Sequence, residues 1–401
     1  MTYSPPPPPG EFASPLAQPR HGAGALIPPG PPAAVHVPAL PVTARRGRVA
    51  SVWLFGILVV VLVVLVGYFL SALGAAASII GMVVAVVPFL VVLAAARLVD
   101  RWEPEPWSLV VFAIAWGAIA AVAIALLVDL LISGALGGVE SGARDVLRSV
   151  VQAPIVEEIG KGIGLLIIFA SARRAFDGPV DGVVYGALIG AGFAFTENIQ
   201  YFAISYIEGG AGELTTTFFV RGILSPFAHA MFTAVTGFAL GLAARRGSSI
   251  GAALGPWCLG LSGAILLHAF WNGSAMFGDF FQLYLTLQIP LFVLFILGVL
   301  ALKREEARLT RNRLGDYALA GWFTPQEVDM LATPAGRRAG LAWARTLTGD
   351  RTATMKTFIA DATALAAARQ RAISGRDPRA ADDEHVLLTR TAAARSALLA
   401  R

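Results

Sequence analysis

The sequence predicts an all-α membrane protein: a polytopic bundle of about eight transmembrane helices, preceded by a proline-rich segment and followed by a small helical tail. Two observations lead to this prediction. Apolar residues make up 56% of the 401 residues and charged residues only 14%, a composition far from that of ordinary soluble domains. The apolar residues also fall into eight long runs, each near the roughly 20 residues that one helical crossing requires.

The predicted spans follow one another with short connections. They comprise residues 50–71, 75–96, 107–132, 152–172, 182–206, 223–243, 250–274 and 280–302. Glycines recur at four-residue spacing in the fourth to sixth spans, as at Gly182, Gly186 and Gly190. Because lipid provides no hydrophobic force between helices, small residues at this spacing favour close backbone contact. We therefore expect these three spans to form the inner part of the bundle.

Basic residues mark one side of the membrane. The segment before the first span and the loops after the second, fourth, sixth and eighth spans carry Arg45, Arg46, Arg48, Arg97, Arg101, Arg173, Arg174, Arg245, Arg246, Lys303 and Arg304. The opposite loops carry only Arg144, Arg148 and Arg221. The positive-inside rule therefore predicts a multi-pass protein of the cell membrane with both termini in the cytoplasm. This distribution explains the net charge of +5, and no nucleic-acid partner is expected.

Residues 1–49 are expected to form a disordered cytoplasmic tail. They open with a run of prolines, Pro5 to Pro9, and continue mainly with Pro, Gly and Ala. Such a segment cannot bury a core, and part of it favours polyproline II. It also lacks the small-residue cleavage pattern of a signal peptide. The transmembrane domain is predicted to begin only after it, over residues 50–304.

The segment 305–401 is expected to be a cytoplasmic helical tail rich in Ala and Arg. Thr324 and Glu327 form a capping-box pattern with Pro325 at the first helical position, which predicts the start of a helix. Residues 352–373 show helical periodicity. The sequence of this tail names no partner.

Polar side chains occur in four of the predicted spans at a common depth. Alternate spans run in opposite directions, and the rise of 1.5 Å per residue places all of these side chains roughly 5–14 Å below the outer boundary of the membrane. Ionisable groups in lipid cost several kcal/mol and face a protein interior when they persist. We therefore expect one catalytic or ion-binding centre, built from Glu157, Glu158, Lys161, Glu197, Asn198, His229, His268 and Asn272.

The fourth span carries two carboxylates and a lysine. Glu157 and Glu158 lie four and three residues before Lys161, so all three share one side of a helix. Pro154 is expected to start that helix and to leave both carboxylates in its first turn, where the helix dipole favours negative charge. A glutamate beside a histidine-held metal can take a proton from water that attacks a carbonyl. Glu157 or Glu158 is therefore the predicted general base.

The remaining polar residues suit a metal centre. His229 and His268 are the predicted ligands of a divalent metal, with Zn²⁺ as the expected ion, and Glu197 is either a third ligand or an orienting group. The single cysteine, Cys258, excludes an intramolecular disulfide and a cysteine-based zinc site. Residues expected to support the ligands or to stabilise an oxyanion are Asn198, Asn272 and Lys161.

Three alternatives to this mechanism are a serine protease, a transporter and a non-catalytic scaffold. Ser262 lies in a Gly-Leu-Ser-Gly sequence that resembles the serine motif of rhomboid proteases, but it precedes His268 by six residues. That spacing on one helix corresponds to about 240° and 9 Å, so the two cannot form a dyad. A proton- or ion-coupled transporter would also bury Glu, His and Lys, yet internal repeats and a midplane site would then be expected. A non-catalytic scaffold is the third alternative.

Four ordered motifs resemble the PrsW family of intramembrane proteases, which is related to the CPBP superfamily of CAAX-processing enzymes. The hairpin from Asp100 to Trp107 also resembles the acidic, proline-containing loop of that family. The resemblance covers roughly residues 50–305. The motifs are Glu157-Glu158-x-x-Lys161, Phe193-x-x-x-Glu197-Asn198, His229-x-x-x-Thr233-x-x-x-Gly237 and His268-x-x-Trp271-Asn272.

This resemblance implies a bacterial multi-pass peptidase, either a metalloprotease or a glutamate-dependent protease. It implies a single-pass, membrane-anchored protein as substrate and cleavage near the outer face of the bilayer. Regulated proteolysis of an anti-sigma factor is the activity associated with the family.

Overall fold

The computed structural model describes residues 46–101, 103–135, 141–277, 279–375 and 377–400. The expectation of a disordered tail falls mainly on residues 1–45, which lie outside the described residues. Within the described chain, contacts define two compact units, one ending at Ala301 and one beginning at Leu302. Every regular element that the structure describes is helical, which confirms the predicted all-α class.

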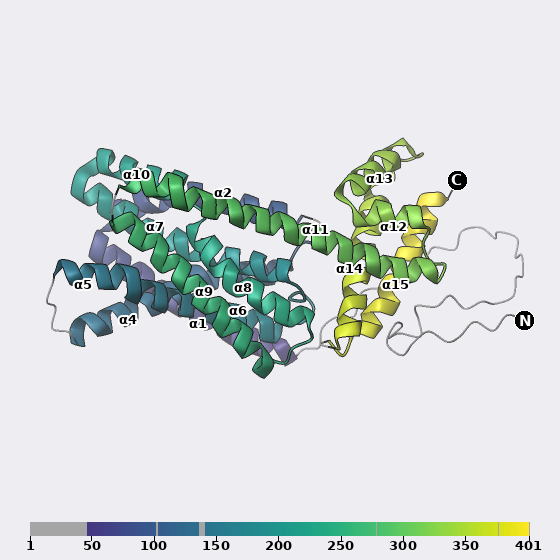
Figure 1. Cartoon of the computed structure of the whole chain (residues 1–401), viewed down its shortest axis with the longest axis horizontal. Helices are drawn as coiled ribbons and strands as arrows, with labels where there is room; N and C mark the ends of the chain where they lie inside the picture. The colour runs from purple at the N-terminus through teal and green to yellow at the C-terminus, as the bar shows by residue number, and fades with distance from the viewer. Residues whose placement is uncertain (1–45, 102, 136–140, 278, 376, 401) are drawn as a thin grey trace, which may run out of the picture. The chain divides into compact units, whose positions relative to one another are not determined.

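Helices occupy all eight predicted spans of the first unit (Figure 1), and helix α7 continues past the predicted end of the fifth span to Phe218, with a non-helical kink at Gly210. In the described part of the chain, four short π-helices, η2 to η5, interrupt or join the α-helices. The elements are α1 (Arg46–Leu73), α2 (Ala75–Val99), α3 (Trp107–Ala115), η2 (Trp116–Ala121), α4 (Val122–Ala135), α5 (Gly142–Leu147), η3 (Arg148–Gln152), α6 (Ala153–Ser171), α7 (Pro179–Phe218), η4 (Phe219–Leu224), α8 (Ala228–Arg245), α9 (Ile250–Met276), α10 (Phe280–Leu283), η5 (Tyr284–Gln288) and α11 (Ile289–Leu319).

Six stretches of the described residues are long and apolar enough to cross a membrane, so the protein is a multi-pass membrane protein. One stretch, Pro179–Arg245, contains both α7 and α8. Helix α6 is not among the six, because its 19 residues include two glutamates and a lysine. The eight predicted spans therefore correspond to these six stretches, with α7 and α8 counted separately and α6 added.

Helices α7 and α8 form the interior of the first unit. The most apolar part of their stretch is 72% buried, compared with 17–33% in the stretches of α1, α2, α3–α4 and α9. Glycines bring the two backbones together: a Cβ placed on Gly182 would lie 2.0 Å from the carbonyl oxygen of Gly237. The corresponding distance from Gly186 to the carbonyl oxygen of Thr233 is 2.7 Å. The glycine spacing therefore predicted this close contact correctly.

The second unit contains the end of α11 and four further helices: α12 (Pro325–Ala332), α13 (Pro334–Thr346), α14 (Thr352–Ser374) and α15 (Ala380–Leu399). Helix α12 begins with the predicted capping box, since the backbone N–H of Thr324 donates to Glu327 at 2.8 Å and the N–H of Glu327 donates to the Thr324 hydroxyl at 3.2 Å. Helix α14 matches the predicted periodic segment within one residue.

Candidate active site

Helix α6 brings three predicted residues into the interior. Contrary to expectation, Glu157 and Glu158 do not lie in the first turn of a helix. The helical backbone continues from α5 through η3 into α6, and Gln152, which precedes α6, is itself helical. Proline removes one backbone N–H, and the wider hydrogen-bonding pattern of a π-helix accommodates such an interruption. Pro154 therefore sits inside a continuous helical stretch.

Lys161 is the centre of a buried polar cluster. Its side chain is fully buried and lies on the same side of α6 as both glutamates, as the spacing predicted. The ammonium donates to Glu158 Oε1 at 2.6 Å and lies 3.5 Å from Glu157 Oε2. It also lies 3.2 Å from His229 Nδ1 and 4.1 Å from the centre of the Phe193 ring.

Glu158 has hydrogen-bond partners at both carboxylate oxygens. Besides Lys161, its Oε1 contacts His268 Nδ1 at 3.0 Å. Its Oε2 accepts a hydrogen bond from the Thr233 hydroxyl at 3.1 Å. These contacts come from α6, α8 and α9, and Glu158 therefore ties three helices together around His268.

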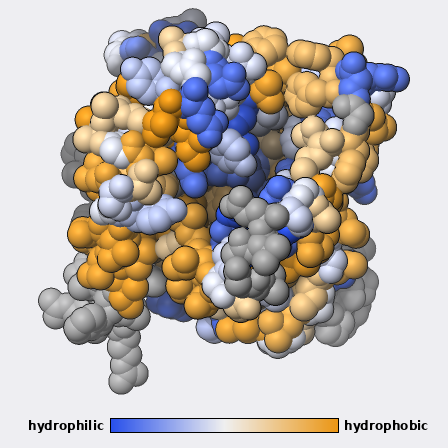
Figure 2. All heavy atoms as spheres, turned by 90° about the vertical axis from the view of Figure 1, so that its left-hand side faces the viewer, coloured by the Kyte–Doolittle hydropathy of each residue, from blue (hydrophilic) through white to orange (hydrophobic). Residues whose placement is uncertain are grey.

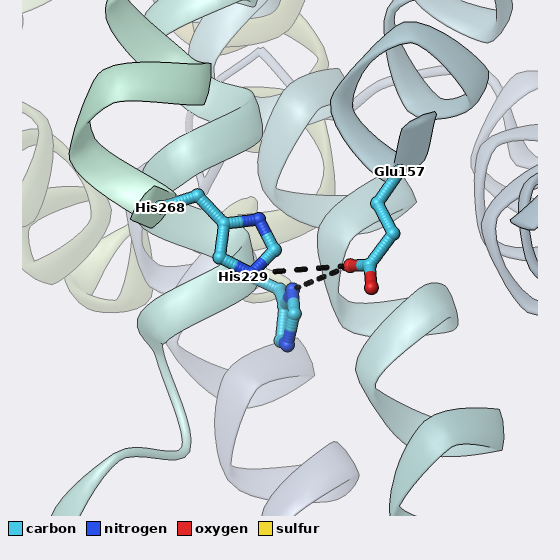
Figure 3. Close-up of side chains that lie close together, drawn as sticks. All are labelled: Glu157, His229 and His268. Atoms are coloured by element: carbon cyan, nitrogen blue, oxygen red, sulfur yellow. Dashed lines mark ion pairs between the residues drawn. The ribbon is translucent and has the colours of Figure 1, made fainter. Parts of the chain in front are cut away.

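Glu157 differs from its neighbour in one respect. Its Oε2 atom is buried and has no hydrogen-bond partner. It lies 3.9 Å from His268 Nε2 and 4.0 Å from His229 Nδ1 (Figure 3). The two imidazole rings are nearly perpendicular, at 88°, and present one nitrogen each toward this oxygen. Within the described residues, Glu157, His229 and His268 form a group whose potential ligand atoms lie within 4.8 Å of one another.

Glu197 lies beside this group rather than within it. Its Oε2 is 2.9 Å from His229 Nε2, the ring nitrogen that faces away from Glu157. His229 therefore contacts the Glu197 carboxylate and His268 contacts the Glu158 carboxylate, each through one ring nitrogen. The other nitrogen of each ring lies near Glu157. Of the two roles predicted for Glu197, the orienting one agrees better with this geometry.

Arg221 was not predicted as a site residue. It belongs to the short π-helix η4 and pairs with Glu197. Its Nε donates to Asn198 Oδ1 at 2.7 Å, and its guanidinium lies 3.9 Å from the centre of the Tyr201 ring. Arg221 lies just before the sixth predicted span, and this position could have indicated a role in the site. The prediction used Arg221 only to orient the protein in the membrane.

The other polar candidates hold helices together near the group. Asn272 donates to the backbone carbonyl of Ser149 at 2.9 Å and so links α9 to η3. The Ser262 hydroxyl donates to the carbonyl of Cys258, one turn earlier in its own helix, at 2.9 Å. The local contact of Ser262 is that of a helix-surface residue and gives no support to the serine mechanism.

The residues present fit a divalent metal. A buried carboxylate oxygen without a hydrogen bond and two imidazole nitrogens converge, and a His₂Glu set is one that catalytic zinc sites use. Ligating histidines usually donate their other ring N–H to a carboxylate, which fixes the tautomer. Here Glu197 is the carboxylate beside His229, and Glu158 is the carboxylate beside His268.

Two cavities reach the group. The smaller, about 180 Å³, is lined by His229, His268, Arg221 and Asn272 among others. The larger, about 460 Å³, reaches Glu157 between α4, η3, α6 and α7. Both are lined by Glu197. Figure 2 shows the end of the first unit where α5 and α10 lie, and hydrophilic residues surround a hollow in this face.

The fold and the site define a multi-pass helical membrane protein with a candidate metal-binding group of Glu and His side chains buried among its helices. Comparison with known proteins indicates a family. Residues 105–298, just under half of the chain, match the model of the PrsW family intramembrane metalloproteases. The four motifs found in the sequence all lie inside the matched region, which agrees with the predicted resemblance.

Two curated relatives carry this name. The chain is 32% identical over 158 residues to Protease PrsW of Geobacillus kaustophilus (strain HTA426), which is 39% of this chain and 64% of the relative. It is 37% identical over 79 residues to Protease PrsW of Bacillus subtilis (strain 168), which is 20% of this chain and 33% of the relative. The chain thus spans less than two thirds of either relative. No solved structure matches the chain.

Proposed function

We propose that this protein is an intramembrane peptidase that hydrolyses a peptide bond of a membrane-anchored protein. The observation that carries the proposal concerns the Glu157 Oε2 atom. This atom is buried, has no hydrogen-bond partner, and lies between one nitrogen of His229 and one nitrogen of His268. A buried acceptor without a partner costs about 1–3 kcal/mol. Such a cost is expected where a water, a metal or a substrate group completes the arrangement in the working enzyme.

The two adjacent glutamates have different roles in this proposal. Glu157 takes a proton from the water that attacks the substrate carbonyl, because its buried Oε2 accepts no hydrogen bond and lies near a nitrogen of each histidine. Glu158 orients His268 and anchors Lys161, because both of its oxygens are already engaged. Lys161 in turn supplies the positive charge that allows two carboxylates to be buried side by side.

Glu157, His229 and His268 would hold the divalent metal. When bound, it would activate the water and polarise the substrate carbonyl. The Glu157 carboxylate would then both help to hold the metal and accept the proton. Glu197 orients His229, and Arg221 keeps the Glu197 carboxylate in place through their ion pair. Asn198, which follows Glu197 on α7, accepts a hydrogen bond from Arg221 and so supports its position.

Asn272 is the proposed donor to the oxyanion. Its amide nitrogen has two hydrogens, one of which is used by the Ser149 carbonyl. Its side chain lines both cavities that reach the group. The second hydrogen can therefore stabilise the negative charge that develops on the substrate carbonyl oxygen.

The arginine pattern supports an orientation in which both termini are cytoplasmic and the site lies nearest the outer face. In that orientation the substrate is a single-pass protein that is cut near its exit from the bilayer, and an anti-sigma factor is one protein of this kind. Reporter fusions test the orientation: fusions after Arg174 and Arg246 should report a cytoplasmic location, and a fusion at Gly210 an external one. A cytoplasmic signal at Gly210 would contradict this orientation.

The activity itself can be tested with purified full-length protein in liposomes that contain a set of tagged single-pass reporters with different apolar spans. The wild type should cut at least one reporter inside or next to its span. Glu157→Gln should abolish the cut while thermal unfolding stays close to that of the wild type. Zinc analysis of the same samples should show bound metal in the wild type and its loss in His268→Asn. Normal cleavage by Glu157→Gln would refute the proposal.

A further inference from the structure

The second unit contains a pocket of its own, outside the region that matches the family. The pocket has a volume of about 400 Å³ and lies among α12, α13, α14 and α15. The buried side chains of Met355, Phe358 and Leu398 line it. Ligand sites usually enclose about 300–1,000 Å³ and are lined mainly by apolar and aromatic side chains. The pocket therefore has the size and the lining of a binding site for an apolar ligand.

Two large apolar side chains of this pocket are exposed. Trp343 is 43% exposed and Leu399 is 60% exposed. Single exposed apolar residues are normal on protein surfaces, but these two continue a buried apolar lining. The lining also has a polar part, where Arg395 Nε donates to Glu327 Oε1 at 2.5 Å. The side chain of Arg395 is 36% exposed, so its remaining N–H groups can meet an acidic group of a ligand.

The size of the pocket favours an extended chain over a helix. An α-helix is about 10–12 Å across with its side chains, so this pocket would hold only about one turn of it. A polyproline II chain has no internal hydrogen bonds, and its proline rings bind in aromatic-lined grooves. Trp343 and Phe358 supply the aromatic surface. The indole N–H of Trp343 can also donate to a free carbonyl of such a chain.

The protein carries a segment of this kind in its own sequence. Pro5 to Pro9 are five consecutive prolines, and Glu11 follows them. These residues lie outside the described part of the chain. Proline fixes φ near the polyproline II value, so a run of prolines loses little conformational entropy on binding. Glu11 provides an acidic group next to the run, which complements Arg395 in charge.

The proline run is tethered so that it can reach the second unit. Residues 10–45 connect it to Arg46, the first residue of α1. A flexible chain of this length has a root-mean-square span of about 35 Å. The proposed topology has eight crossings, an even number, which leaves residues 1–45 and the second unit on the same side of the membrane in either orientation. Tethering by a flexible linker gives an effective concentration of about 1 mM, at which a contact with a Kd of about 0.1 mM is about 90% occupied.

We propose that the segment from Pro5 to Glu11 binds, as polyproline II, in the pocket of the second unit of the same chain. The proline rings pack on Trp343, whose indole N–H donates to a backbone carbonyl of the segment, and Glu11 pairs with Arg395. The head and the second unit then form one closed module, which another proline-rich chain opens by competition. This inference does not rest on the proposed peptidase function, because both partners lie outside residues 105–298.

Disulfide formation in the full-length protein in liposomes tests this contact. Cys258→Ala first removes the single native cysteine, and Ser4→Cys places a thiol next to the proline run. The second thiol is either Ala339→Cys, which lies in the pocket, or the control Ala360→Cys. Ala360 is exposed and lies about 140° around α14 from Met355. Mass spectrometry of digests after mild oxidation measures the rate at which each disulfide forms.

The disulfide at position 339 should form about tenfold faster than the one at position 360, because the segment occupies the pocket about 90% of the time. Changing the middle three prolines of the run to glycine should lower the rate at position 339 to that at position 360, and so should Trp343→Ala. Thermal unfolding should stay close to the wild type in both, since Trp343 is partly exposed. Equal rates at the two positions, or a rate at position 339 that neither change lowers, would overturn the proposal.

A mixing experiment identifies which chain supplies the segment. Protein with Ser4→Cys alone is combined with protein with Ala339→Cys alone, both in the Cys258→Ala background. The mixture should form little disulfide; as much as in the double variant would assign the segment to a second copy and overturn the same-chain contact. Adding Glu157→Gln to the double variant should leave its disulfide rate unchanged, so loss of the peptidase and loss of this contact are distinguishable.

Discussion

The contact between α7 and α8 at Gly190 fixes the position of His229, and a single methyl group should disturb it. A Cβ placed on Gly190 would lie 2.3 Å from the carbonyl oxygen of His229 and 2.8 Å from the Cα of Ala230. Ordinary van der Waals contact begins at 3.4 Å. In Gly190→Ala the two helices must therefore separate by about 1 Å, because both obstructing atoms are backbone and cannot rotate away.

The magnitude of the effect follows from this displacement. Overpacking of an interior costs about 1–3 kcal/mol, and a misplacement of about 1 Å at a catalytic group can cost about 100-fold in rate. Gly190→Ala should therefore unfold at a lower temperature and cleave a reporter about 100-fold more slowly. The matched control is Gly212→Ala, beyond the kink of α7 at Gly210, since a Cβ on Gly212 meets no atom within 4 Å.

Thermal unfolding of the purified proteins and initial cleavage rates in liposomes are the two assays. Gly212→Ala should behave like the wild type in both. If Gly190→Ala keeps the wild-type rate and unfolding temperature, the close backbone contact between Gly190 and His229 does not position His229.

Three further predictions concern charged groups. Lys161→Met leaves buried carboxylates without their cation and should lower stability by about 3–5 kcal/mol, measurable by thermal unfolding. Arg221→Met should leave the fold intact but weaken zinc binding and cleavage by about 10–100-fold, because His229 loses its fixed orientation; zinc titration measures this. Burial and the charge of Asp181 raise the pKa of Glu105 well above its usual value, although the Tyr185 hydroxyl donates to it at 2.5 Å. The folded state therefore binds the Glu105 proton more tightly than the unfolded state does. The contribution of Glu105 to stability is highest below its unfolded pKa and is lost as pH rises through its folded pKa. Thermal unfolding measured across pH should show this dependence in the wild type and not in Glu105→Gln.

Each of these predictions has a result that contradicts it. Unchanged stability of Lys161→Met would mean that the buried carboxylates do not depend on the ammonium. Zinc affinity in Arg221→Met equal to that of the wild type would remove the orienting role of Glu197. A Glu105→Gln variant whose stability falls with pH as steeply as the wild type would assign the dependence to another group.

The sequence was informative about the fold because the bilayer restricts what a chain can do. An apolar run long enough for one crossing satisfies its backbone hydrogen bonds inside the bilayer by forming a helix. The eight spans were therefore predictable within a few residues at most boundaries. The common depth of Glu157, Glu197, His229 and His268 followed from span direction and helical rise. The structure brings these four side chains together.

Details that depend on side-chain direction were not predictable. The distinction between Glu157 and Glu158 arises from contacts to His268 and Thr233 on other helices, which no spacing within α6 reveals. Arg221 reaches Glu197 from the π-helix η4, and π-helices change the direction of a side chain without a recognisable sequence pattern. The failed prediction for Pro154 has the same origin, since η3 carries the helix through the proline.

The central claim is that Glu157, His229 and His268 act as one centre. The most direct test is the single-turnover cleavage rate of a single-pass reporter by Glu157→Gln, His229→Asn, His268→Asn and the triple variant, with all proteins reconstituted in the same liposomes. Residues that act as a unit are strongly non-additive, so each single change should lower the rate about as much as the triple change. Losses that multiply from one change to the next, or a wild-type rate in any single variant, would contradict the claim.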